Sequence, residues 1–214
     1  MTDRQLTTAA YIILGLLTSR DWSAYQLAEQ VGRGVDQLWP RADRQRYITP
    51  KLLLERGLVT ARTEPTGQRT RTIYSITQAG RDELARWLTT ESRPPVLEFE
   101  GMIRVLFAEQ GSIEDLRGTL EEMRRQSIAA RDLFASHASL IATTGGTFPE
   151  RQHLFGLANR FMIGHYSHII EWSTWALEQT ASWPDVTSPA TSNDAQIQEM
   201  LAPALAVLPA PKRP

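Results

Sequence analysis

The chain has 214 residues and no cysteine. It can therefore form no disulfide bond, no thiolate zinc site and no cysteine nucleophile. Its longest apolar run, residues 9–17, is about half as long as a membrane span must be. This run could pass for the core of a signal peptide, but acidic Asp3 precedes it and no small-residue cleavage site follows. We expect a cytoplasmic protein without a membrane segment.

The chain also lacks the patterns that mark common catalytic sites. No serine has a histidine and an acid at a familiar spacing, and the sequence contains no glycine-rich phosphate loop. We expect neither enzyme activity nor a bound cofactor.

Charge is unevenly distributed, although the formal net charge is only −1. Residues 1–90 carry 13 Lys and Arg against 9 Asp and Glu, whereas residues 91–214 carry 10 against 15. The stretch from Arg33 to Arg71 alone holds nine basic residues against four acidic ones. This split indicates one half that faces nucleic acid and another that faces a partner; the alternative is chance clustering on a solvated surface.

The first 90 residues show the order helix, helix, helix, hairpin, helix. An apolar segment over residues 7–18 predicts the first helix, and Ser23 is the expected N-cap of the second. Gly32 or Gly34 is expected to end that second helix. Its inward face is expected to consist of Tyr25, Leu27, Ala28 and Val31.

A third helix is predicted over residues 41–56, with Gly57 at its C-cap. Thr49 as N-cap and Pro50 at the first helical position would let the helix restart there without losing a hydrogen bond. Residues 59–63 and 70–76 read as strands around a turn at residues 64–68, because β-branched residues alternate in both. Thr77 is the expected cap of a fourth helix that ends near Trp87.

Residues 91–214 show the apolar periodicity that is typical of long helices. Ser112 is the expected N-cap of a helix that the sequence breaks at residues 143–146, and a last helix is predicted over residues 149–180. The last helix carries two apolar stripes, and a helix that is apolar on two flanks needs two partners. We infer that a second copy supplies one of them, as a homodimer. Residues 184–214 hold six of the twelve prolines and are expected to be a largely disordered tail.

The chain resembles the PadR family of transcriptional regulators over about residues 8–90. Four pieces carry the likeness: residues 11–17 with 25–27; Trp39 and Pro40 with Gln45 and Tyr47; residues 53–59 around Gly57 and Leu58; and residues 74–77 followed by Gly80, Leu84, Trp87 and Leu88. Two positions depart from the family pattern, Arg44 in place of a small residue and Pro50 in place of leucine, and they leave the identity of the base-reading residues open.

The resemblance implies a mainly α fold, with a winged helix-turn-helix at residues 1–90 and a helical dimerisation and effector domain at residues 91–183. It implies a homodimer that binds double-stranded operator DNA through its third helix and through a wing tip at residues 66–72. Arginine and glutamine can read bases, whereas lysine and tyrosine more often contact phosphate. The predicted DNA-binding residues are Arg41, Arg44, Gln45, Arg46, Tyr47, Lys51, Gln68, Arg69 and Arg71.

Aromatic side chains crowd the predicted dimer region and could stack on a planar effector, although such rings more often form core or interface. His165, His168 and Glu171 have a spacing that can ligate a metal, but no further ligand is evident, and we predict none. The predicted effector pocket consists of Trp39, Phe161, His165, His168, Trp172 and Trp175. The predicted dimerisation residues are Leu116, Leu120, Met123, Phe134, Leu154, Phe161, Ile169 and Trp172.

The sequence therefore predicts a dimeric DNA-binding regulator, a repressor that a small aromatic ligand could release. Two alternatives stay open, namely a winged helix used for protein–protein contact and a ligand sensor without specific operator binding.

Overall fold

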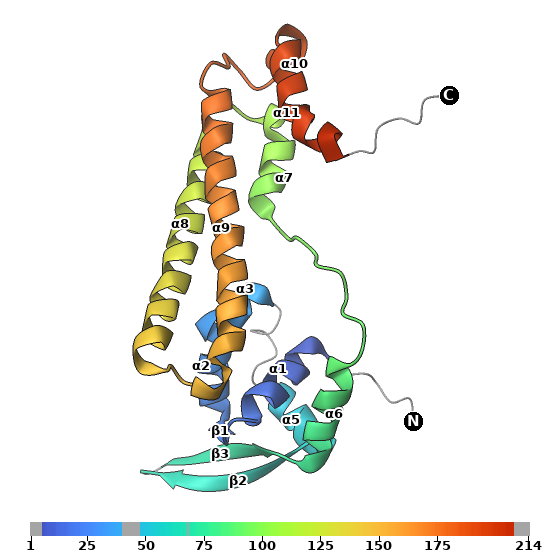
Figure 1. Cartoon of the computed structure of the whole chain (residues 1–214), viewed down its shortest axis with the longest axis vertical. Helices are drawn as coiled ribbons and strands as arrows, with labels where there is room; N and C mark the ends of the chain where they lie inside the picture. Colours follow the sequence, from blue (N-terminus) through green and yellow to red (C-terminus); the bar gives the residue numbers. More distant parts are fainter. Residues whose placement is uncertain (1–5, 40–47, 68, 208–214) are drawn as a thin grey trace, which may run out of the picture. The chain divides into compact units, whose positions relative to one another are not determined.

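The computed structural model describes residues 6–39, 48–67 and 69–207, which form two compact units, residues 1–95 and 96–214 (Figure 1). The described elements of the first unit are α1 (Thr8–Leu17), β1 (Trp22–Ser23), α2 (Ala24–Gln30), a π-helical turn (Val31–Val35), α3 (Asp36–Leu38), α5 (Thr49–Glu55), β2 (Val59–Thr66), β3 (Arg69–Ile76) and α6 (Gln78–Leu88). This order agrees with the winged-helix prediction.

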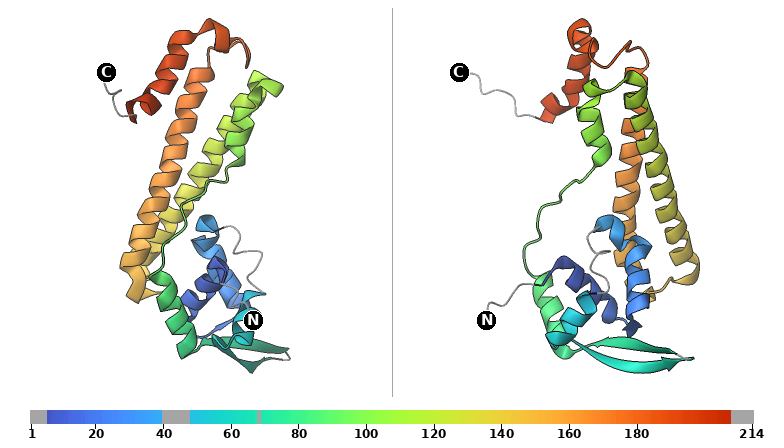
Figure 2. Two further views of the ribbon diagram at one scale, coloured as in Figure 1. Left: turned by 90° about the vertical axis from the view of Figure 1, so that its right-hand side faces the viewer. Right: turned by 180° about the vertical axis from the view of Figure 1, so that it is seen from behind.

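The sheet of the first unit is antiparallel, with strand order β1-β3-β2. Strands β2 and β3 pair from Val59 opposite Ile76 to Thr66 opposite Arg69, so the predicted hairpin is confirmed and its strands reach closer to the tip. Gly67 adopts a φ of 59° at that tip, a left-handed conformation that glycine accepts without strain. The hairpin projects from the helices as a wing (Figure 2).

The predicted N-caps of the second and fourth helices are confirmed. The Ser23 hydroxyl accepts from the Gln26 amide, and the Gln26 side chain accepts from the Ser23 amide, which completes a capping box. The Thr77 hydroxyl accepts from the Gly80 amide at 3.0 Å. These bonds satisfy backbone donors that a helix start otherwise leaves unpaired.

Two predictions for the second helix are wrong. The chain stays helical through Gly32 and Gly34 as far as Leu38, because neither glycine adopts the positive φ that would end a helix. Tyr25 is 71% exposed, since it lies about 200° around the helix from buried Leu27 and therefore points the opposite way. The two-residue strand β1 was not predicted.

The core of the first unit joins α1 to the sheet and to α6. Its largest fully buried side chains include Ile13, Leu14, Trp22, Leu27 and Leu53. These side chains come from α1, β1, α2 and α5, so their burial stabilises the packing of these elements in the first unit.

A polar contact reinforces the packing between α1 and α6. The Tyr11 hydroxyl donates to Glu83 Oε1 at 2.8 Å, and the Tyr11 ring stacks on Trp87 with centroids 4.5 Å apart. Burial together with this contact to the Glu83 carboxylate raises the pKa of Tyr11 to about 12. Arg86 donates to the same carboxylate, and so the tyrosine proton is held in place by a charged pair.

The second unit is helical in its described part. Its elements are α7 (Glu100–Leu106), a 3-10 turn (Ala108–Gln110), α8 (Ile113–Thr144), a 3-10 turn (Pro149–Arg151), α9 (Gln152–Thr180), α10 (Pro189–Ser192) and α11 (Asp194–Val207). Helices α8 and α9 form an antiparallel pair that lies side by side in every view (Figures 1 and 2). Both long helices were predicted, with the Ser112 cap and the break at Gly145, whose φ is 79°. Helix α7 was not predicted.

One stripe of α9 packs on α8 and the other does not. Met162, Ser173 and Ala176 are buried, and Asn159 donates to the Phe134 carbonyl on α8 at 2.9 Å. Along the other stripe Leu154 and Phe161 are 55% and 65% exposed. The described chain therefore satisfies one apolar flank of α9 and leaves the second open.

The predicted disordered tail is wrong for most of its length, because residues 189–192 and 194–207 are helical. Trp183 packs against the cluster of Ile113, Leu116, Leu120 and Ala176. The Trp183 indole donates to Gln196 Oε1 at 2.9 Å, and Gln196 donates to the Gln179 carbonyl at 3.1 Å. A half-buried aromatic ring and an amide thus fix the start of α11 to the end of α9. Residues 208–214 lie outside the described residues.

Within the described ranges, no helix combines the length and the apolar character needed to cross a bilayer.

Candidate nucleic-acid interface

Helix α5 supplies the described part of the predicted recognition helix. Its N-cap position is Ile48 rather than Thr49, so Pro50 falls at the second helical position. The missing N–H of Pro50 still lies in the first turn, where no helical hydrogen bond is lost. Thr49, Pro50 and Leu53 are buried, whereas Lys51 is exposed. Burial of one face of α5 therefore presents Lys51 to solvent.

Only part of the predicted DNA-binding set can be placed. Lys51 is described on α5 and Arg71 on β3, together with the backbone of Arg69. The other predicted contacts lie outside the described residues, namely Arg41, Arg44, Gln45, Arg46, Tyr47 and Gln68.

The wing carries a chain of ion pairs along one face. Arg71 Nη2 lies 3.0 Å from Glu64 Oε2, and Arg62 Nε donates to Glu64 Oε1 at 3.1 Å. Arg62 Nη1 also donates to Asp21, which precedes β1, at 2.5 Å. The four side chains alternate in sign, so their charges compensate each other. The basic count of this region thus overstates the positive charge that the wing presents.

These ion pairs shift the acids toward ionisation. The hydrogen bond from Arg71 lowers the pKa of Glu64 against the opposing effect of burial. The hydrogen bond from Arg62 lowers the pKa of Asp21 in the same way. Sequence reasoning missed this network, although residues 62 and 64, and equally 69 and 71, had to share a strand face.

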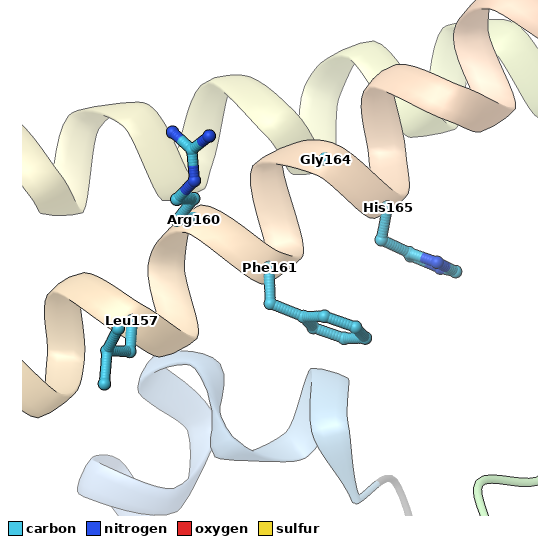
Figure 3. Close-up of a pocket in the computed structure, with 5 residues that line it drawn as sticks. All are labelled: Leu157, Arg160, Phe161, Gly164 and His165. Carbon is cyan, nitrogen blue, oxygen red and sulfur yellow. The ribbon is translucent and has the colours of Figure 1, made fainter.

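The second candidate site is a hollow on the open flank of α9 (Figure 3). It measures about 510 Å³ and is lined by Leu157, Arg160, Phe161, Gly164 and His165. The rings of Phe161 and His165 are nearly parallel, with centroids 6.4 Å apart. The hollow is therefore lined by two flat rings and one guanidinium, and the sequence did not predict Leu157, Arg160 and Gly164 as lining residues.

The other predicted effector residues do not line this hollow. Trp172 packs against the core cluster of the second unit, while His168 and Trp175 are exposed elsewhere on α9. Trp39 follows α3 in the first unit. In the described part of the chain, no three His, Asp or Glu side chains gather as metal ligands would.

Half of the predicted dimerisation residues are buried within the chain itself, and their place on a dimer interface stays a prediction. They contribute to the packing of α8, and they are Leu116, Leu120, Met123 and Phe134. Ile169 and Trp172 are half-buried. Only Leu154 and Phe161 of the set are largely exposed.

The first unit, whose described helices α1, α2, α3 and α5 precede a hairpin wing and the closing helix α6, defines a winged-helix protein. No protein-family model matches the chain. The negative transcriptional regulator PadR of Bacillus subtilis (strain 168) is 26% identical over 136 residues, which are 62% of this chain and 75% of that protein.

Solved structures extend the likeness to most of the chain. Bacillus subtilis PadR in complex with operator DNA has a TM-score of 0.68 at 22% identity, over 81% of this chain and 99% of that one. The same protein with p-coumaric acid gives 0.64 at 22% identity, over 82% and 100%. The PadR-like transcriptional regulator BC1756 from Bacillus cereus gives 0.69 at 18% identity, over 84% and 99%. The chain is thus similar in sequence to PadR and similar in fold to these PadR-like structures, and the relatives themselves are named as regulators.

Proposed function

We propose that the chain is a DNA-binding transcriptional repressor that acts as a homodimer and is released by a small aromatic acid. The observation that carries the proposal is the winged-helix unit with exposed Lys51 on α5 and Arg71 on the wing. The operator-DNA complex of its relative PadR, and the name of that protein as a negative regulator, support it.

On DNA, α5 and the residues before it would enter the major groove, and the wing would touch the backbone. Lys51 would contact phosphate as a point charge, and Arg71 could hold a phosphate through two parallel N–H bonds. The predicted contacts at residues 41–47 would supply the base readout. Sequencing of genomic fragments retained by the purified chain should therefore yield one shared motif with two related half-sites.

Substitution sharpens that test. Lys51→Ala should reduce the retention of every fragment, because it removes one phosphate contact. The slope of log K against log salt should become shallower by about 0.9. Arg125→Ala on α8 is the matched control, since Arg125 is exposed and pairs with Glu122 on the same helix. Retention of random fragments without a shared motif would favour the protein–protein alternative.

The homodimer would form along the open flank of α9. Leu154 and Phe161, with Leu157 at 71% exposure, present apolar side chains that the described residues do not cover. Light scattering of the purified chain should give twice the mass of one copy. Phe161→Glu should shift the mass toward one copy, whereas exposed Glu171→Gln should leave it unchanged. A single-copy mass for the unmodified chain would reject the dimer.

The effector would bind the hollow on α9, between this helix and the second copy of the proposed homodimer. Phe161 and His165 could stack on an aromatic ring while Arg160 pairs with a carboxylate. The complex of the relative PadR with p-coumaric acid supports a ligand of this class. Titration with p-coumarate should quench tryptophan fluorescence and release DNA, and Arg160→Gln should weaken both effects together. DNA release that survives Arg160→Gln would move the effector site elsewhere.

A further inference from the structure

One acidic side chain lies among the basic residues of the wing. Glu64 stands directly opposite Arg71 in the register of β2 and β3, so both side chains project from the same face. Its two carboxylate oxygens are divided between two guanidinium groups, Oε1 toward Arg62 and Oε2 toward Arg71. A carboxylate is the side chain whose charge and geometry most resemble a phosphate diester.

We propose that Glu64 is an internal competitor for the Arg71 guanidinium, which it holds in the free protein and gives up to a backbone phosphate when the wing meets DNA. The proposal rests on the proposed DNA-binding function. Its consequence is that Glu64 lowers the affinity of the wing for any duplex, so that binding depends more on the base contacts of the recognition helix.

The hydrogen-bond geometry indicates that Glu64 competes with a phosphate for Arg71 rather than positioning Arg71 to bind one. Arg71 binds Glu64 through Nη2, and Nη2 belongs to both edges through which a guanidinium grips an oxyanion with two parallel bonds. The carboxylate therefore takes part of an edge that a phosphate would use. Both side chains are partly exposed, 47% for Arg71 and 32% for Glu64, so solvent and phosphate can reach the pair.

The Arg71–Glu64 ion pair is also weak enough for a phosphate to replace the carboxylate. Ion pairs at this exposure are screened by solvent and contribute little to folding, whereas a duplex presents a dense row of phosphates. The lowered pKa of Glu64 keeps its carboxylate charged at neutral pH, so the competitor is present under the conditions in which DNA is bound.

The ion-pair network limits the consequence of losing the Glu64 charge to Arg71. Arg62 keeps a second acid, because its Nη1 donates to Asp21 and it also contacts the Ser75 hydroxyl at 3.2 Å. Loss of the Glu64 charge would therefore release Arg71 while Arg62 stays tied to Asp21.

The test is a polarisation titration of the full chain against a fluorescein-labelled duplex of fixed mixed sequence, over a series of salt concentrations. Glu64→Gln should bind about three- to tenfold more tightly at low salt, because a like charge is removed and a guanidinium is released. The slope of log K against log salt should steepen by about 0.9 for the added phosphate contact. Glu64→Ala should give the same gain, and circular dichroism should show both variants folded.

Two controls separate this exchange from a change in net charge. Glu91→Gln alters the net charge equally at an exposed position in the same unit and should leave the slope unchanged. In an Arg71→Ala background the gain from Glu64→Gln should fall to that of charge removal alone, with no change of slope.

Weaker or unchanged binding by folded Glu64→Gln would overturn the proposal, since Glu64 would then position Arg71 or be indifferent to DNA. Equal gains with and without Arg71 would overturn it as well. If the unmodified chain binds no duplex even at low salt, the proposed function itself fails, and the role of Glu64 falls with it.

Discussion

Gly80 is the position where the winged-helix unit tolerates no added atom. A Cβ at this residue would lie 2.1 Å from the Leu58 carbonyl oxygen and 2.9 Å from Ile76 Cγ1. The Leu58 carbonyl cannot easily retreat, because it accepts from the Thr77 amide at 3.1 Å at the start of α6. The close approach of α6 to the backbone of Leu58, just before β2, therefore requires glycine.

Gly80→Ala should consequently destabilise the chain. Overpacking against backbone costs about 3 kcal/mol at the upper end of its usual range. Alanine in a helix regains at most about 1 kcal/mol over glycine. The net loss should be about 2 kcal/mol in the free energy of unfolding, measured by urea titration with circular dichroism.

Gly15→Ala in α1 is the matched control, because a Cβ there meets nothing within 4 Å. It should stabilise the chain by up to about 1 kcal/mol. Equal stability of the two variants would refute the packing argument, since both replace a helical glycine by alanine and only one creates a clash.

Three further results are expected from contacts outside the proposed DNA interface. The folded pKa of Tyr11, about 12, lies above its ordinary value of 10, so the stability it contributes is complete below pH 10 and is lost as the pH rises toward 12. The loss of stability between pH 10 and pH 12 should be about 2–3 kcal/mol. In Tyr11→Phe the free energy of unfolding should change less with pH over that interval. An unchanged pH dependence in this variant would contradict the expectation. Arg117→Met should cost about 2 kcal/mol, because Arg117 Nη2 donates to the carbonyls of Thr180 and Trp183 at the end of α9. Arg125→Met, at an exposed pair, should leave the free energy of unfolding almost unchanged, and equal losses would refute the capping role of Arg117.

Local signals in the sequence were sufficient for most of the fold. Ser23, Thr77 and Ser112 cap helices because their hydroxyls satisfy nearby amides, and this depends only on the next three residues. The hairpin followed from alternation and the Gly67 turn. The long helices followed from apolar spacing, which a single chain displays without reference to its neighbours.

The predictions were wrong where contacts between residues far apart in the sequence determine the local structure. Gly32 can end a helix or continue one, and the choice depends on what the following segment packs against. Two residues of β1 carry no pattern of their own and become a strand by pairing with β3. The proline-rich end of the chain follows Trp183, which packs against an apolar cluster whose members Leu116 and Leu120 lie more than 60 residues earlier in the sequence.

The sequence predicted several of the residues in the candidate sites, but it did not predict the ion pairs and neighbours that these residues have in the structure. The basic residues of the wing were evident from the sequence, whereas their neutralisation by Glu64 and Asp21 required the register of two strands and the turn before β1. Likewise, Phe161 and His165 were predicted together, but Arg160 joins them only because the flank of α9 is open.

The central claim is that the winged-helix unit grips a double helix in a sequence-dependent manner. The most direct measurement is the affinity of the purified chain for the DNA upstream of its own coding region and for a shuffled duplex of equal length, across a range of salt. We expect tighter binding to the upstream duplex, with log K falling linearly as log salt rises. Equal affinity for the two duplexes at every salt concentration would contradict the account.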